Sequence, residues 1–133
     1  MVRFFVLSAY EVIAEAGFAV AMARGLIATA RREGITVATG VQDAVGDAAY
    51  VVRTTKDALF ALLRLSVADE ESTKGFLVAM QELGADIEEF GIAVEEGFEG
   101  VEGEELRECV EDFGRAMEGF REAVGTFETT IVV

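Results

Sequence analysis

Hydrophobic residues recur along the chain in alternating steps of three and four, which is the spacing of an α-helix with one buried stripe. Near the C-terminus the pattern is unbroken, through Leu106, Val110, Phe113, Met117, Phe120, Val124, Phe127 and Ile131. Another run follows the same rule through Phe76, Met80, Leu83, Ile87, Phe90, Val94, Gly97 and Val101, with Phe98 beside the one glycine. These two segments are predicted to be helices that pair with each other.

Two further helices are predicted in the first half of the chain. The segment from about residue 36 to residue 67 has its stripe at Val41, Val45, Ala48, Val52, Thr55, Leu59 and Leu62. In the N-terminal segment, two series recur every seven residues: Ala9, Ala16, Ala23 and Ala30, and beside them Val6, Ile13, Val20 and Ile27. Small side chains in register allow two helix axes to approach closely.

The helix ends are predicted from capping residues. Arg31 and Arg32 followed by Gly34 indicate a C-terminus, and residues 69–72 supply oxygen atoms for an N-terminus. Gly100 and Gly103 bracket the third connection. Short connections favour antiparallel neighbours, so the predicted fold is an all-α, antiparallel four-helix bundle with long coiled-coil-like helices.

One helical domain over residues 1–133 is therefore expected, built from an apolar hairpin (1–67) and an acidic hairpin (68–133). At either end, residues 1–8 and 127–133 are rich in β-branched and aromatic side chains, which favour strands. Continuation of the helix is the favoured interpretation there, and a short strand or an extended arm exchanged between subunits is the alternative.

The N-terminal helix carries more apolar side chains than one stripe can hold. Phe18, Met22 and Leu26 lie outside both series, and a helix that is hydrophobic nearly all round is normally buried all round. Exposing each would forfeit roughly 1.5–3 kcal/mol. This helix, with part of the second, is therefore predicted to pack against other copies of the chain, through Ala9, Ile13, Ala16, Gly17, Phe18, Val20, Met22, Ala23, Leu26, Ile27 and Ala30.

Two alternatives remain for the same helix. It can be the central helix of a monomer, with the other three wrapped round it. It can also lie at a membrane surface, because Gly17, Ala21 and Gly25 have the four-residue spacing of helix contacts in lipid. Sparse basic residues argue against a membrane, and the uncharged stretches fall short of the roughly 20 residues that a spanning helix needs.

Charge is unevenly divided along the chain, whose formal net charge is -14. Residues 1–67 carry seven basic and six acidic side chains, whereas residues 68–133 carry four and nineteen. The second half is therefore expected to form an acidic outer surface. Direct binding of nucleic acid is not expected, because phosphates need clustered Lys or Arg. Abundant Glu and the absence of Asn match part of a thermophilic composition.

The chain is expected to act inside a cell or within an assembled particle, of viral or cellular origin. Its apolar N-terminus is interrupted by Glu11 and Glu15, unlike a secretion signal. The single Cys109 cannot form an intramolecular disulfide and is interpreted as a small packing residue. No cofactor is expected.

Candidate chemistry is limited because the chain has no His, the usual general base near neutral pH and a common metal ligand. Two segments spell E-E-x-x-E, Glu95-Glu96-x-x-Glu99 and Glu104-Glu105-x-x-Glu108, which places carboxylates one helical turn apart. This resembles part of the motif of the all-α nucleoside triphosphate pyrophosphohydrolases, and the resemblance implies Mg²⁺ binding. That family also needs E-x-x-D on a following helix, where this chain has Glu108-x-x-Glu111 and Glu118-x-x-Arg121.

Several glycines fall inside the predicted helices, each at a cost of about 1 kcal/mol relative to Ala. Gly17, Gly84, Gly91, Gly114 and Gly119 are predicted to mark close approach of neighbouring backbones. A protein without an evident active site, with dense helix packing and surplus apolar surface, is expected to be a non-enzymatic structural subunit of a coat, filament or scaffold. The alternatives are a Mg²⁺-dependent hydrolase using Glu95, Glu96, Glu99, Glu105 and Glu108, or a regulatory adaptor that docks on another protein.

Overall fold

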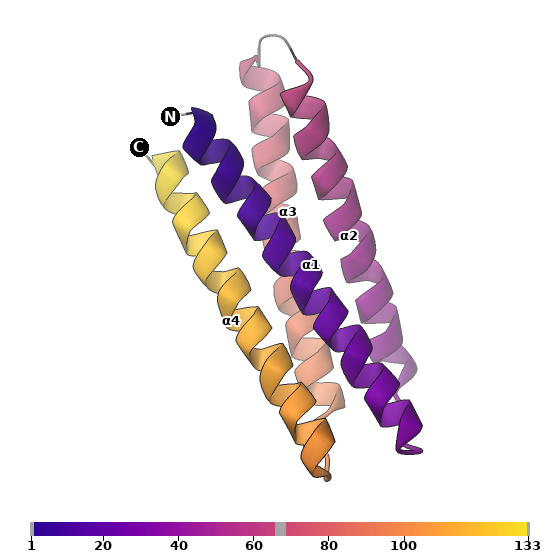
Figure 1. Cartoon of the computed structure of the whole chain (residues 1–133). Coiled ribbons are helices and arrows are strands. Elements are labelled where there is room, and N and C mark those ends of the chain that lie inside the picture. Colours follow the sequence, from indigo (N-terminus) through magenta and orange to yellow (C-terminus); the bar gives the residue numbers. More distant parts are fainter. Residues whose placement is uncertain (1, 66–68, 133) are drawn as a thin grey trace.

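The computed structural model describes residues 2–65 and 69–132, and these form an antiparallel four-helix bundle (Figure 1). Helix α1 spans Val2–Arg32, α2 Thr39–Leu63, α3 Glu70–Gly97 and α4 Glu104–Val132. The all-α prediction is confirmed. Helix α2 is shorter than expected, since it begins at Thr39 and ends at Leu63, and the expected end at Val67 lies outside the described residues.

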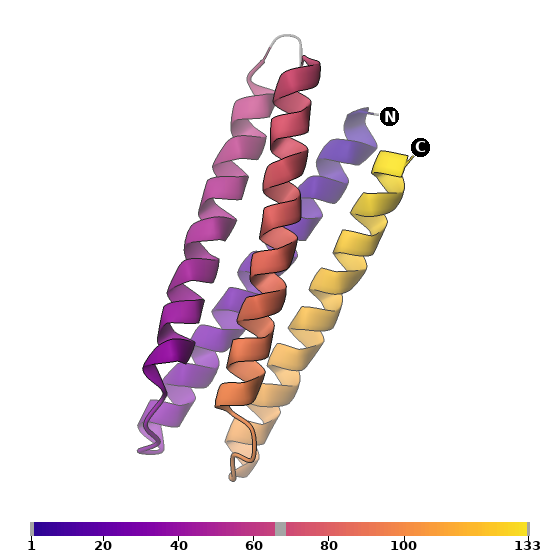
Figure 2. The ribbon, with the colours of Figure 1, turned by 180° about the vertical axis from the view of Figure 1, so that it is seen from behind.

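The chain ends continue the helices. Residues 2–8 are helical in α1 and residues 127–132 in α4, so the alternative of a strand or an extended arm is wrong for these residues. The physical reason is that helix α1 and helix α4 run side by side there (Figures 1 and 2). Phe5 contacts Phe127 at a ring-centroid distance of 5.4 Å, and tertiary packing of this kind overrides the strand preference of β-branched residues.

The capping residues act as their sequence positions predict. After α1, the Ile35 amide donates to the Ala30 carbonyl at 2.9 Å, and Gly34 has a φ of 77°, which is the left-handed conformation of a helix stop. Before α3, the Asp69 carboxylate accepts a hydrogen bond from the Ser72 amide at 2.6 Å, and this bond lowers the pKa of Asp69. Gly100 and Gly103 also adopt positive φ, and both lie in the connection between the end of α3 at Gly97 and the start of α4 at Glu104.

Helix α1 packs most extensively on α4 and next on α2, and α2 packs most extensively on α3 (Figures 1 and 2). Contacts between α1 and α4 extend along both helices: the Glu15 carboxylate lies against Gly119, Cys109 Sγ is 3.7 Å from Thr29 Oγ1, and Arg32 pairs with Glu105. Small buried residues on both helices, including Ala16, Ala19, Ala23, Ala116 and Ala123, permit this approach.

The expectation that the third and fourth segments pair directly is corrected, because the backbones of α3 and α4 make few close contacts. Large side chains bridge them instead. Phe90 and Phe113 meet edge to face with centroids 5.5 Å apart, and Arg121 donates to Glu88 at 2.9 Å. This hydrogen bond raises the pKa of the Arg121 guanidinium. The bulk of Phe and Met side chains holds these two helix axes apart, whereas Ala brings α1 and α4 together.

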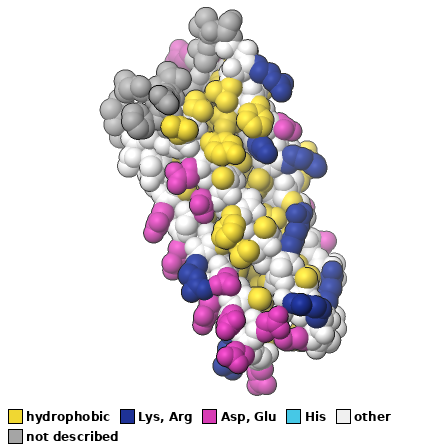
Figure 3. Space-filling view, viewed as in Figure 1, with side chains coloured by type: hydrophobic (Ala, Val, Ile, Leu, Met, Phe, Trp, Pro, Cys, Tyr) yellow, Lys and Arg dark blue, Asp and Glu magenta, His cyan; other side chains and the backbone are white. Residues whose placement is uncertain are grey.

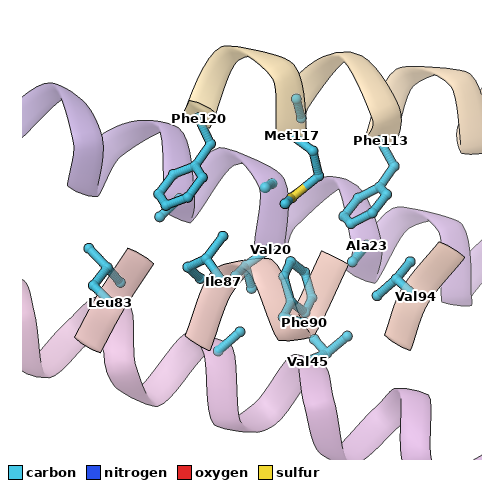
Figure 4. Close-up of a cluster of buried hydrophobic side chains, with 14 of the residues drawn as sticks. Val20, Ala23, Val45, Leu83, Ile87, Phe90, Val94, Phe113, Met117 and Phe120 are labelled. Carbon is cyan, nitrogen blue, oxygen red and sulfur yellow. The ribbon is translucent and has the colours of Figure 1, made fainter. Parts of the chain in front are cut away.

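Side chains from all four helices meet in one core (Figure 4). The stripe predicted on α3 is buried from Phe76 to Val94, and Phe98 is buried after Gly97. On α4 the buried face is rotated slightly from the prediction: Val110 and Val124 are half-buried and Ile131 is exposed, while Ala116 and Ala123 are buried. The rotation turns small residues of α4 inward, as its close packing on α1 requires.

The five glycines predicted to mark close approach divide into two groups. A Cβ on Gly91 would lie 2.6 Å from Met117 Cε, one on Gly119 would lie 2.9 Å from Glu15 Oε2, and one on Gly17 would make an ordinary contact with Val52. A Cβ on Gly84 or Gly114 would have no such atom within 4 Å in the part of the chain that the structure describes. The prediction of close backbone approach is therefore wrong for Gly84 and Gly114, and at the other three positions the neighbouring atoms belong to side chains.

Gly97 at the end of α3 gives a test of the packing. A Cβ there would overlap Val41 on α2, a β-branched side chain with little rotamer freedom. We expect Gly97→Ala to lower the free energy of unfolding by about 1–3 kcal/mol. The matched change Gly114→Ala, where space is open, is expected to raise it by about 0.5–1 kcal/mol. Urea denaturation measures both, and equal effects would contradict the packing.

Candidate functional site

Most of the eleven residues predicted to contact other copies lie in the core of the single chain. Phe18 is 51% exposed, Gly17 and Met22 are half-buried, and Leu26 is 1% exposed. The buried members are Ala9, Ile13, Ala16, Val20, Ala23, Leu26, Ile27 and Ala30. Their side chains pack within the protomer and do not lie on the surface of the single folded chain.

Helix α1 buries more than one stripe because α4 and α2 flank it on two sides. Val12, Ala19 and Leu26 form a third buried series that the sequence interpretation did not separate from the surface. Their seven-residue spacing was the available signal. The helix is nevertheless not enclosed by its own chain, so the alternative of a central helix wrapped by the other three does not describe the bundle (Figure 1).

The opposite side of α1 is an exposed apolar strip, here called the α1 outer face. Leu7 is 57% exposed and Tyr10 50%, values close to that of Phe18. The face consists of Leu7, Tyr10, Glu11, Ala14, Gly17, Phe18, Ala21, Arg24, Gly25 and Ala28, of which only Gly17 is half-buried. It carries two charges over six helical turns. Leu7 and Tyr10 were missed by the sequence interpretation, although Leu7 is in phase with Ala14, Ala21 and Ala28.

The surroundings of the α1 outer face are charged. Figure 3 shows hydrophobic side chains along the middle of this side of the molecule, with Lys and Arg mainly along the α2 edge and Asp and Glu mainly along the α4 edge. Helix α3 carries eight acidic and one basic side chain, and α4 carries eight and three. The α1 outer face is thus an apolar interruption in a charged surface, and such patches mark interaction sites.

By length and composition, the segment Phe5–Arg32 of α1 is apolar enough to cross a membrane, and 39% of its most apolar window is buried inside the chain. The uncharged stretches are short, but isolated charges such as Glu15 and Arg24 leave the helix apolar on average. A core helix of a bundle meets the same criteria, so the finding is weak evidence for a membrane.

The carboxylates of the two E-E-x-x-E segments are not brought together. Glu95 and Glu96 lie exposed at the end of α3, Glu99 lies in the following connection, and Glu105 forms an ion pair with Arg32 at 3.3 Å. Within residues 2–65 and 69–132, no three His, Cys, Asp or Glu side chains are grouped to hold a metal ion. Glu108 is likewise exposed on α4. The residues required by the hydrolase alternative do not form a common site.

Two grooves run between helices. One, of about 550 Å³, lies between α3 and α4. Its lining includes Val12, Met80, Phe120 and Phe127. The other, of about 760 Å³, lies between α2 and α3 beside Tyr50 and Ile92. Every buried side-chain nitrogen and oxygen atom in the described part of the chain has a hydrogen-bond partner. Neither groove therefore has an unpaired buried polar group, such as those that orient ligands.

Fold and surface together define the class of protein: an all-α antiparallel four-helix bundle with an apolar face on α1 and acidic helices α3 and α4. Comparison with protein family models, curated proteins and solved structures finds no match.

Two alanines on α1 test which face of the helix is buried in the core of the single chain and which is exposed. Ala23 is fully buried and Ala21, two residues earlier, is exposed. We expect Ala23→Arg to destabilise the fold by about 3 kcal/mol or more, because it forces a charge into the core. Ala21→Arg is expected to change stability by about 0.5 kcal/mol or less. Thermal and urea unfolding measure the contrast; similar losses would mean that α1 is oriented differently.

Proposed function

We propose that this chain is a non-enzymatic structural protein that self-associates through the α1 outer face and presents α3 and α4 as an acidic outer surface. The observation that carries the proposal is the row of three large apolar side chains, Leu7, Tyr10 and Phe18, each at least half exposed on one helix face. The rest of the face is mostly Ala and Gly, and Glu11 and Arg24 are its two charged residues.

The energetics support burial of this face. Apolar surface removed from water contributes about 25 cal/mol per Å², and a fully buried large side chain contributes roughly 1.5–3 kcal/mol. Three half-exposed side chains on one strip therefore represent several kcal/mol of available association energy. The small residues beside them cost little conformational entropy on burial, since Ala and Gly have no rotamers to lose.

The charge distribution supports the same orientation. Because α1 and α2 are near neutral and α3 and α4 are strongly acidic, two copies repel least when their α1 sides meet. The acidic helices then remain in water, where carboxylates are well solvated. Exposed ion pairs such as Lys74 with Glu70 contribute little to stability, which is consistent with a surface whose role is solvation.

Sedimentation velocity on the purified chain over a hundredfold range of concentration tests the proposal. We expect a concentration-dependent dimer or larger species, and Phe18→Asp is expected to weaken association at least tenfold by placing a charge in the contact. The control is Val78→Asp, because Val78 on α3 is exposed to the same extent as Phe18 and should leave association unchanged.

Two results would overturn the proposal. One is a wild-type chain that stays monomeric at high protein concentration. The other is a monomer that binds neutral phospholipid vesicles through Phe18, which would assign the α1 outer face to a lipid surface. Thermal unfolding of both variants checks that neither substitution changes the fold.

A further inference from the structure

We infer that the partner on the α1 outer face is a second copy of the same chain, packed with α1 antiparallel to α1 about a two-fold axis between Gly17 and Phe18. The inference rests on the proposed self-association and specifies its geometry. Its basis is the order of large, small and charged side chains along this face, which is complementary when read in opposite directions from the point between Gly17 and Phe18.

In antiparallel packing about this point, each position of one copy lies at the same height as the position equally far from the point in the other copy. Position 7 therefore pairs with 28, and position 10 with 25. Every position of the exposed face then meets a complement. Large side chains meet small ones, small meets small, and the acidic residue meets the basic one. The pairs are Leu7 with Ala28, Tyr10 with Gly25, Glu11 with Arg24, Ala14 with Ala21, and Gly17 with Phe18.

Size complementarity allows close packing without a cavity. Leu7 and Tyr10 each meet an Ala or Gly of the other copy, so large side chains face spaces toward both ends of the strip, and the two Phe18 side chains meet beside the axis. With Ala14 and Ala21 facing each other, the two helix axes can approach to about 8 Å. A Cβ added at Gly25 would have no atom of the described residues within 4 Å, so the space that Tyr10 of the other copy would enter is open.

The charges select the same orientation. Glu11 and Arg24 are the two charged residues of this face, and an antiparallel contact forms two ion pairs between them across the axis. A parallel contact would instead oppose Glu11 with Glu11 and Arg24 with Arg24, and it would face Leu7 and Tyr10 with their own large counterparts. Neither residue has an ion-pair partner among the described residues.

The proposed two-fold axis passes α1 between Gly17 and Phe18, and this point also lies at the middle of the exposed face. Glu11 and Phe18 lie at one edge of the face and Gly17 and Arg24 at the other, so the face is symmetric about this point. A self-complementary patch on both subunits is what an isologous dimer requires. The centre of the sequence symmetry and the centre of the exposed face therefore agree, although one comes from residue order and the other from burial.

Disulfide crosslinking tests the geometry. In a Cys109→Ser background, single variants Ala14→Cys and Ala21→Cys are mixed and oxidised, and products are identified by mass spectrometry. We expect the mixed disulfide between positions 14 and 21 to predominate. Homodisulfides should be rare, because seven residues of helix separate position 14 from its own copy by about 10 Å. Ala85→Cys, at an exposed position on α3, controls for random collision.

The outcomes separate the geometry from the proposed function. Homodisulfides at 14 or at 21 would establish a parallel contact and overturn the inference while self-association stands. A wild-type dimer without any of these crosslinks would place the contact on another face. A chain that remains monomeric in sedimentation would overturn the proposed function together with the inference.

Charge reversal gives an independent test of the same pairing. Glu11→Arg and Arg24→Glu are each expected to raise the dimer dissociation constant roughly tenfold, since two ion pairs become two repulsions. The double variant Glu11→Arg with Arg24→Glu restores opposite charges across an antiparallel contact, so its dissociation constant should return to within about threefold of wild type. Additive weakening in the double variant would overturn the antiparallel geometry.

Discussion

Close packing of α1 against α4 is the constraint on which the rest of the bundle depends. Fully buried alanines such as Ala16 and Ala23 let the two helices run side by side from Phe5 near Phe127 to Arg32 near Glu105. Large side chains are then left to fill the other side of the core, where Phe90 meets Phe113 and holds α3 and α4 apart. Alanines therefore bring α1 and α4 close together, and Phe side chains keep α3 and α4 further apart.

This unequal spacing also decides what reaches the surface. Because α4 and α2 flank α1 closely, α1 buries three heptad series but leaves its far side open. The same small-residue spacing then occurs twice on one helix, inward at Ala9, Ala16, Ala23 and Ala30 and outward at Ala14, Ala21 and Ala28. The inner alanines make a close contact with α4. The outer alanines have the composition that a second close helix contact would need. The helix is apolar enough for both because its charges are few.

Sequence patterning predicted the fold well because the information is local. Heptad spacing, the Gly34 stop and the Asp69 cap act within one or two helical turns. Which helices pair was not predictable in this way: α3 and α4 have matching stripes, yet the partner of α4 is set by side-chain size on α1. For the candidate site, Phe18 was correctly expected to be exposed in a lone bundle, whereas Leu26 is buried. An apolar residue outside two buried stripes can belong to a third buried stripe or lie on the surface. Only the packing of the neighbouring helices decides between the two.

An isologous contact through α1 closes at two subunits, because each copy uses the same patch once. Such a dimer would carry acidic α3 and α4 on both outer sides, and like charges there oppose further stacking. A coat or filament would therefore need a second contact away from the two-fold axis. The groove between α2 and α3 offers exposed Tyr50 and Ile92 beside carboxylates such as Asp86 and Glu89. Growth beyond the dimer would then depend on neutralising these carboxylates, so charge would control assembly size while the apolar face sets the building unit.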